Sequence, residues 1–443
     1  MLVLFGLVFF FIAPLSKTAD EFFAAKKADG KEPGMILLAA SLVISWIFAK
    51  SITNAANLGM EFGMVGSVAY GAYYVSFVVA GWIIYQLRVQ GGFKSIHQFL
   101  QSRFGRSAVS LFSILICIRL FNEVWSNTMV IGSYFGSAGS SPYILSIIVV
   151  TLLTLAYTMK GGMRSSLLTD AIQMFFFGLM LLIILALIMP DKDVSVGSMI
   201  TSGEWKLESG INLLLAALLQ CLSYPFHDPV LTDRGFISSP KITLRSFFIA
   251  SIVGFFCIVL FSFVGIYASA KGLVGQAPVE VAKLMGLTGL LTINLIMITS
   301  AASTLDSTFS SFSKLVVIDL GKEGMRTVSR GRWMMVLLVI VGTLPVFFNP
   351  EILSATTVSG TMVMGLAPVF LLWKLKAPPI SFQLPVWFGI IVGILLALDL
   401  IPNQVIFSEG RYASLLWANV WGLLICFVLY LAPIYFNGKK ETA

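Results

Sequence analysis

Residues 298–314 read ITSAASTLDSTFSSFSK, a polar run inside a segment that is otherwise apolar enough to cross a membrane. The run holds nine serines and threonines and one carboxylate, Asp306. Because Ser300, Ser303 and Thr304 follow the spacing i, i+3, i+4, they share one face of a helix. Hydroxyl and carbonyl oxygens are the ligands that a small hard cation prefers. The stretch therefore predicts a cation site inside a membrane protein. The alternative is that its hydroxyls only bond to carbonyls of their own helix or let helices pack closely.

The composition of the whole chain is that of a helical membrane protein with many spans. Of the 443 residues, 58% are hydrophobic and 11% are charged, whereas a soluble domain is about 25% charged. The net charge of +8 is explained by basic loops and does not indicate nucleic acid binding. The four cysteines and two histidines lack metal-ligand or disulfide spacings, and no phosphate-binding loop or nucleophile motif is present. We therefore expect a polytopic membrane protein without an organic cofactor, and not an enzyme.

The apolar runs predict about thirteen transmembrane helices, since one span needs about 20 residues. Residues 1–16 are interpreted as a leading helix, because the basic start and the small-residue cleavage site of a signal peptide are missing. The other spans are expected near residues 34–60, 63–88, 107–135, 143–159, 166–190, 211–231, 244–270, 288–319, 331–348, 351–375, 382–402 and 412–436.

The basic residues of the loops predict the orientation of the chain. Lysine and arginine are frequent in alternate loops and rare in the loops between them. Because basic loops remain in the cytoplasm, we expect the N-terminus outside and the C-terminus inside, in the plasma (inner) membrane. The basic loops carry Lys17, Lys26, Lys27, Lys31, Arg88, Lys94, Arg103, Arg106, Lys160, Arg164, Arg234, Lys241, Arg245, Lys314, Lys322, Arg326, Arg330, Arg332, Lys374, Lys376, Lys439 and Lys440. The other loops carry Lys192, Lys206, Lys271, Lys283 and Arg411.

The spacing of the spans predicts an internal repeat. Five spans in residues 34–190 are followed by five in residues 211–375, at an offset of roughly 180 residues that corresponds to an odd number of helices. The second five therefore have inverted topology, an architecture that puts the solute site at mid-membrane between the repeats. Residues 382–436 add two C-terminal helices. A row of similar helices also produces a rough offset, which is the alternative explanation.

Two helices in equivalent positions of the repeats carry polar interruptions. The first reads ASLVISWIFAKSITNAANLG, and its polar centre AKSITNAAN covers residues 49–57. The second reads LLLAALLQCLSYPFHDPVLTDRG, where Pro225 and Pro229 remove backbone donors and disfavour helix at the residues before them. Paired breaks of this kind indicate a binding site, although a proline also produces an ordinary kink.

Five motifs between residues 17 and 320 have counterparts in one known family, and the resemblance covers nearly the whole chain. They are KTADEFF (17–23), SIHQFLQSRFG (95–105), GGMRSSLLTDAIQ (161–173), SAASTLDS (300–307) and VVIDL (316–320). Together they resemble the motifs of the sodium/solute symporter family, whose fold is the five-plus-five inverted repeat of the LeuT type. The resemblance implies an all-α polytopic membrane protein with one leading and two trailing helices around that repeat. The segment SWIFAKSITNAANLGMEFGMVG (45–66) also looks somewhat like the urea symporters of the family.

The same resemblance implies a sodium site and a solute site. Asp170 matches an aspartate that assists sodium binding from nearby, Tyr224 matches an aromatic residue that closes over the solute, and Arg234 matches the arginine that follows that helix. The implied sodium ligands are the carbonyls of Ala49, Ile52 and Ser300 and the hydroxyls of Ser303 and Thr304. The solute is expected to contact Lys50, Asn54, Tyr224 and Asp228.

Lys50 and Asp228 depart from the family pattern. Lys50 stands where small or polar residues are usual, and Asp228-Pro229 stands where the family often has Asn-Gln. Since a buried ammonium is costly unless it is paired, Lys50 is expected to pair with Asp228, contact an anionic solute, or replace sodium with a titrating amine. The remaining alternative is that its head reaches a water-filled vestibule. Arg119 and Glu123, spaced i, i+4, are expected to neutralise each other inside the bundle.

These features predict a secondary active transporter that couples a small polar solute to sodium by alternating access. Proton coupling through Lys50, a solute-sensing membrane module of the same fold, and a channel remain alternatives. The run SATTVSGT (354–361) is expected to add small hydroxyls to the pore wall. The expected partners are the solute and the lipid bilayer, with a monomer as the functional unit.

Overall fold

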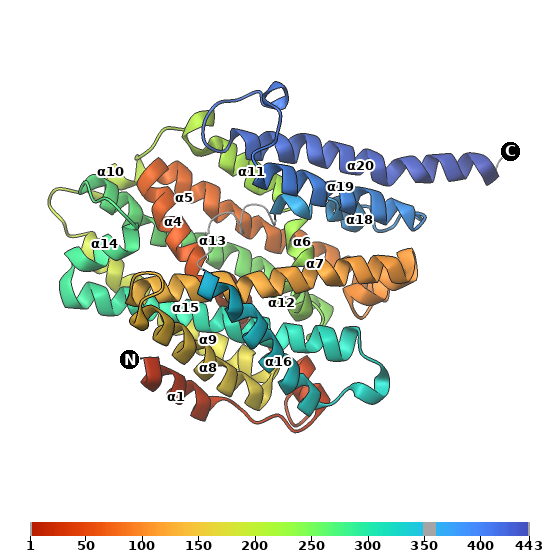
Figure 1. Cartoon of the computed structure of the whole chain (residues 1–443), viewed down its shortest axis with the longest axis horizontal. Helices are drawn as coiled ribbons and strands as arrows, with labels where there is room; N and C mark the ends of the chain where they lie inside the picture. Colours follow the sequence, from red (N-terminus) through yellow and green to blue (C-terminus); the bar gives the residue numbers. More distant parts are fainter. Residues whose placement is uncertain (1, 349–359, 442–443) are drawn as a thin grey trace.

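The computed structural model describes residues 2–348 and 360–441, and the regular structure of these residues is helical (Figure 1). Within this part of the chain, nine helices are long and apolar enough to cross a membrane, or ten if one bent pair counts as a single span. Large apolar side chains on the outer faces of the bundle, such as Phe175 and Leu182, are exposed as expected for contact with lipid. The predicted all-α membrane fold is confirmed, and the number of thirteen spans stays a prediction.

The first half of the bundle contains nine α-helices and one 3₁₀ turn. The Ser140 side chain caps one of them, α8, and Pro142 occupies its first turn, which fixes where that helix begins. The elements are α1 (Leu2–Ile12), α2 (Ala19–Ala24), α3 (Met35–Trp46), α4 (Ala49–Phe62), α5 (Met64–Gly71), η1 (Ala72–Tyr74), α6 (Val75–Val89), α7 (Ile96–Phe135), α8 (Ser141–Gly161) and α9 (Met163–Ile188).

The second half begins with short elements and continues with long helices. The span expected at residues 351–375 lies partly outside the described residues, and so does most of the run 354–361. The elements are α10 (Val196–Ile200), η2 (Leu207–Ile211), α11 (Asn212–Gln220), η3 (Tyr224–His227), α12 (Pro229–Arg234), α13 (Pro240–Ala270), α14 (Ala277–Leu284), α15 (Gly286–Lys314), η4 (Leu315–Asp319), η5 (Glu323–Met325), α16 (Val328–Thr343), η6 (Leu344–Phe348), α18 (Leu366–Leu371), α19 (Ile380–Ala397), η7 (Asn403–Val405) and α20 (Ala413–Glu441).

The span near residues 34–60 is broken, but two residues earlier than the polar centre of its sequence. Helices α3 and α4 meet at an angle of 64°. The non-helical residues are Ile47 (φ −82°, ψ 66°) and Phe48 (φ −61°, ψ 152°), and the polar segment 49–57 is the helical start of α4. The prediction of a break is confirmed, and its placement within AKSITNAAN was wrong. The apolar pair at the break carries no local signal, whereas the polar residues that follow it are compatible with a first helical turn.

The second break lies where the prolines predict it. Helix α11 ends at Gln220, and η3 contains Pro225 close to its start. Asp228 has extended backbone angles (φ −95°, ψ 101°), as expected for a residue that precedes proline. Its carboxylate accepts a hydrogen bond from the Val230 amide and so caps α12, whose first residue is Pro229. Local chemistry therefore determines both ends of this interruption.

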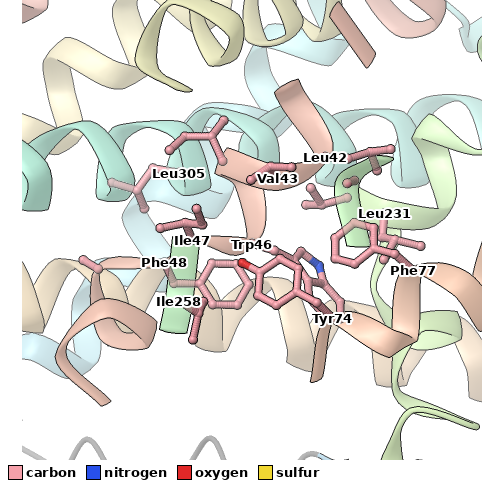
Figure 2. Packing of buried hydrophobic residues seen from close by; sticks show 14 of the residues in the cluster. Leu42, Val43, Trp46, Ile47, Phe48, Tyr74, Phe77, Leu231, Ile258 and Leu305 are labelled. Carbon is pink, nitrogen blue, oxygen red and sulfur yellow. The ribbon is translucent and has the colours of Figure 1, made fainter. Parts of the chain in front are cut away.

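Buried apolar side chains pack around the first break and hold it in place. Figure 2 shows Trp46, Ile47 and Phe48 surrounded by side chains from other elements, among them Tyr74, Phe77, Leu231, Ile258 and Leu305. Trp46 contacts the Phe77 ring edge to face, with ring centroids 4.7 Å apart. Helix packing, more than local sequence, thus fixes the position of this break.

The ends of the helices divide the molecule into two faces. In Figure 1, α1 begins at the left of the view together with α10 and α14, whereas α20 ends at the right. The loop that follows α15 also lies at the right. Its neighbour α7 kinks at Gly105, whose φ of 79° favours glycine, so the amphipathic segment before residue 105 separates from the spanning part. This arrangement is compatible with termini on opposite sides of a membrane.

Candidate functional site

A buried carboxylate, Asp170 of α9, lies against the polar face of α15. The Ser303 hydroxyl donates to Asp170 Oδ1 at 2.6 Å, and the Ser41 hydroxyl donates to Asp170 Oδ2 at 2.5 Å. Ser45 and Ser307 lie within hydrogen-bond distance of the same Oδ2 atom, at 3.3 and 3.4 Å. Three helices, α3, α9 and α15, thus converge on one carboxylate. Ser303, an expected sodium ligand, and Asp170, expected to assist sodium binding, are in direct contact.

The guanidinium of Arg234, at the end of α12, enters the same cluster. Its Nη2 atom lies 2.9 Å from Asp170 Oδ2 and 2.7 Å from the Ser307 hydroxyl. Its Nε atom donates to the Ser41 hydroxyl at 2.6 Å. Arg234 and Asp170 are both fully buried. The pair, with its bonded serines, therefore connects α12 to α3, α9 and α15.

A second buried carboxylate, Asp306, lies next to the first and is bonded to hydroxyls. Its Oδ1 atom accepts from Ser166 at 2.8 Å, and its Oδ2 atom accepts from Tyr157 and Thr169, both at 2.9 Å. The Ser166 hydroxyl also lies 3.1 Å from that of Ser307, which links the two carboxylates through shared hydroxyls. We call Asp170, Asp306, Arg234 and their bonded serines and threonines the ion cluster.

The other implied sodium ligands adjoin the ion cluster and bond within their own helices. The Thr304 hydroxyl donates to the Ser300 carbonyl at 2.9 Å, which is the back-bonding alternative foreseen from the sequence. Ala49 and Ile52 lie in the first turn of α4, and the Ala49 carbonyl accepts from the Thr53 hydroxyl at 3.1 Å. All four residues are buried, and α4 packs against α15.

A chain of four alternating charges crosses the region of the two helix breaks. Lys50 Nζ lies 2.8 Å from Glu123 Oε1, and Glu123 in turn forms an ion pair with Arg119 one turn earlier on α7. Arg119 Nη2 lies 3.3 Å from Asp228 Oδ2, which also accepts from Trp46 Nε1 at 2.8 Å. We call Lys50, Glu123, Arg119 and Asp228 the charge chain.

The charge chain changes the partner expected for Lys50. The lysine is paired with Glu123 of α7 and not with Asp228, which belongs to Arg119 and Trp46. The predicted mutual neutralisation of Arg119 and Glu123 is confirmed by their ion pair. Each charge has an opposite neighbour, so the buried chain is neutral as a whole, as charges inside a membrane protein require.

Aromatic rings surround the charge chain. The Tyr224 ring lies 5.2 Å from the Arg119 guanidinium and 5.6 Å from the Trp46 ring. The Phe48 ring lies 5.1 Å from Lys50 Nζ. Asn54, expected at the solute site, interacts with Tyr70. Three of the four predicted solute residues, Lys50, Tyr224 and Asp228, therefore meet at the charge chain.

Several residues of these clusters were not identified as site residues from the sequence. Glu123 and Trp46 of the charge chain, and Ser41, Ser166 and Asp306 of the ion cluster, are of this kind. Asp306 was visible as a lone carboxylate in a polar helix, which was a signal for its importance. Glu123 was visible as the i, i+4 partner of Arg119. Trp46, Ser41 and Ser166 carry no local signal, since their roles depend on contacts between segments that are far apart in the sequence.

Part of the chain is similar in sequence to known transport proteins. Residues 28–201 match the sodium:solute symporter family. A sodium/glucose cotransporter of Vibrio parahaemolyticus is 23% identical over 165 residues, which are 36% of this chain and 29% of that protein. The chain thus spans under a third of the length of this relative.

Solved transporter structures have the same fold. A Na⁺-coupled sialic acid symporter in a substrate-bound outward-open state matches with a TM-score of 0.73 and 14% identity, over 98% of this chain and 95% of that one. Mhp1, a nucleobase-cation-symport-1 family transporter, matches with a TM-score of 0.60 and 12% identity, over 97% and 95% of the two chains. These neighbours are transporters and not enzymes, and their fold is the LeuT type. Residues 28–201 of the chain are thus similar to the sodium:solute symporter family, and the described chain shares the fold of these transporters.

Proposed function

We propose that the chain is a sodium-coupled symporter that moves a small polar solute by alternating access. The observation that carries the proposal is the contact between the Ser303 hydroxyl and the buried Asp170 carboxylate, near the break between α3 and α4. In this proposal the coupling ion is sodium, and its ligands beside Asp170 are the Ala49, Ile52 and Ser300 carbonyls and the Ser303 and Thr304 hydroxyls. The solute is to bind at Lys50, Tyr224 and Asp228, with Asn54 at the edge.

The charges of the ion cluster support a monovalent cation as the coupling ion. With Asp170 and Asp306 ionised, the two carboxylates outnumber the single guanidinium of Arg234, so the cluster carries one net negative charge. A buried net charge is costly without a partner. One sodium ion in the neighbouring cage compensates it, and a proton on a carboxylate does the same. Sodium and proton are therefore the two candidate coupling ions.

The pairing of Lys50 favours sodium. An uncompensated ammonium about 6 Å from the ion would repel it by roughly 3 kcal/mol at an effective dielectric constant near 20. Glu123 lies 2.8 Å from Lys50 Nζ, so the ammonium is compensated and this repulsion is largely removed. The Glu123 carboxylate favours the charged form of Lys50, which argues against Lys50 as the coupling group.

The test compares a cage variant with a matched control in the purified protein. The double substitution Ser303→Ala and Thr304→Ala removes the two hydroxyl ligands, and we expect it to weaken binding of radioactive ²²Na⁺ in nanodiscs by at least about tenfold. The control is Thr299→Ala with Ser310→Ala, which removes two hydroxyls that bond to carbonyls of the same helix. Unchanged sodium affinity in the cage variant would reject the site.

The coupling ion is tested by transport in proteoliposomes. Uptake of a panel of small polar solutes is measured with an inward sodium gradient and with sodium replaced by choline at constant pH. We expect uptake only with sodium. Uptake that persists in choline and follows a proton gradient would reject sodium as the coupling ion and favour the proton.

A further inference from the structure

The charge chain occupies the place where the two broken helices meet. Lys50 belongs to the start of α4 and Asp228 is the cap of α12, so both lie next to the breaks. Glu123 and Arg119 come from the part of α7 that follows its kink at Gly105. The chain therefore connects both broken spans to a third helix through ion pairs, in the region proposed above for the solute.

Its charges alternate along a single path. The order is Lys50 (positive), Glu123 (negative), Arg119 (positive), Asp228 (negative), and each neighbouring pair is bonded. All four side chains are at least nine-tenths buried. The positive heads also lie over the aromatic rings of Phe48 and Tyr224.

Hydrogen-bonding capacity remains unused beside this path. The Arg119 Nε–H group and the His227 Nε2 atom are buried, and neither has a hydrogen-bond partner among the described residues. The two side chains are neighbours through Tyr224, whose ring lies 5.2 Å from the guanidinium and 4.9 Å from the His227 ring. Buried polar atoms normally have hydrogen-bond partners. These two atoms therefore indicate a place where a polar ligand, called the guest below, would gain hydrogen bonds.

The charge of a guest decides whether it can enter between these partners. A neutral guest that separates one ion pair leaves two buried charges facing a group without charge. A guest with one charge compensates one of them and leaves a net charge in the middle of the membrane. A guest that carries both charges presents an anion to Lys50 or Arg119 and a cation to Glu123 or Asp228. Only this guest preserves both the alternation and the neutrality of the chain.

We propose that the transported solute is a small zwitterion, with a carboxylate and an ammonium separated by a short linker as in an amino acid or a betaine. The inference rests on the location of the solute site in the proposed function. The solute's carboxylate pairs with Lys50 and Arg119, and its ammonium pairs with Glu123 and Asp228. In the absence of solute, the four side chains neutralise one another.

Binding to the purified protein tests the solute class directly. The protein in nanodiscs, in sodium chloride, is titrated with the twenty protein amino acids, glycine betaine, urea and glucose, and thermal stabilisation and calorimetric binding are measured. We expect stabilisation by at least one zwitterion. The amide of the best amino acid, which keeps only the positive charge, and its N-acetyl derivative, which keeps only the negative charge, are expected to bind at least about a hundredfold more weakly.

Two variants with single charge changes separate a binding role from a structural one. Lys50→Met leaves the chain with a net negative charge, so the preference is expected to shift from the zwitterion to the amide. Glu123→Gln leaves a net positive charge, so the preference is expected to shift to the N-acetyl derivative. Loss of packing would weaken all three ligands together. If a variant does not fold, the comparison of the three ligands on the unmodified protein still decides.

The outcomes distinguish this inference from the proposed function. Sodium-driven uptake of urea or glucose, with no zwitterion bound, would overturn the inference and leave sodium symport standing. The same holds if the amide or the N-acetyl derivative binds as tightly as the amino acid. Absence of any zwitterion binding also overturns it. Selective zwitterion binding that does not depend on sodium would support the solute class and reject sodium coupling.

Discussion

Asp306 is a carboxylate in the middle of a spanning helix, and its bonded partners are hydroxyls. Ser166, Tyr157 and Thr169 lie 2.8–2.9 Å from its oxygens. These hydroxyls have alternative acceptors, because Thr169 also lies 3.0 Å from the Ser165 carbonyl and Tyr157 lies 3.3 Å from the Ala302 carbonyl. The surroundings of Asp306 therefore accommodate either an ionised carboxylate or a protonated one that donates to a neighbour.

Substitution of Asp306 by asparagine distinguishes these states. Asp306→Asn keeps the shape and removes one negative charge from the ion cluster. We expect sodium affinity to fall by roughly one to two decades, the effect of one unit charge at about 6–10 Å and an effective dielectric constant near 20. The measurement is ²²Na⁺ binding at pH 7, with Glu280→Gln at the surface as a control. Unchanged sodium affinity together with a lost pH dependence would identify Asp306 as a protonated group.

At the scale of single residues, spacing within one helix is visible in the sequence, whereas partners on other helices are not. The spacing of Ser300, Ser303 and Thr304 was visible because it is local to one helix. The choice between Glu123 and Asp228 as the partner of Lys50 depends on contacts across 73 and 178 positions of sequence, respectively. Spacing within a helix carries no information on such contacts, so only the folded structure determines the pair.

The two broken helices differ in how far their sequences determine the breaks. Pro225 and Pro229 act on their own backbone, so the second break is visible in the sequence and lies where expected. The first break lies at Ile47 and Phe48, which have no intrinsic preference for it. Its position depends on the packing of Trp46 and Phe48 among residues of other helices (Figure 2). Tertiary contacts therefore prevail over local propensity here.

Close contact between α4 and α13 provides a prediction at the scale of helices. A Cβ atom at Gly265 would lie 1.6 Å from the Ala56 carbonyl oxygen. Gly265→Ala must therefore push α4 away, and we expect it to cost about 1–3 kcal/mol, measured as a lower melting temperature in detergent. Gly178→Ala is the control, because a Cβ there has no atom within 4 Å. Alanine at position 178 is expected to be neutral or to stabilise its helix slightly. Equal stability of the two variants would contradict the close crossing.

The alternation of basic loops and loops poor in basic residues along the sequence predicts the orientation of the whole molecule. Ser198, at the α10 end of the bundle, is exposed, and so is Lys322 in the loop after α15 at the opposite end (Figure 1). The positive-inside rule puts Lys322 in the cytoplasm and Ser198 outside. The inverted repeat of residues 34–190 and 211–375 stays a prediction as well.

Labelling of single cysteines tests the orientation in intact cells. An impermeant maleimide should modify Ser198→Cys and should modify Lys322→Cys only after the cells are opened. The unsubstituted protein is the background control, since Cys221, Cys257 and Cys426 are buried. Labelling of Lys322→Cys in intact cells, without labelling of Ser198→Cys, would reverse the assigned orientation.

The shared hydroxyls of the ion cluster have a consequence for how it responds to an ion. Ser307 lies 3.1 Å from both Ser45 and Ser166, and in each contact either oxygen can be the donor. The direction of donation around the cluster is therefore not determined by the positions of the heavy atoms. A cation that arrives can be accommodated first by rotation of O–H bonds, which takes picoseconds to nanoseconds, whereas helices move in microseconds to milliseconds. The hydroxyl hydrogens of the ion cluster would then change their orientation in response to the ion before any helix has moved.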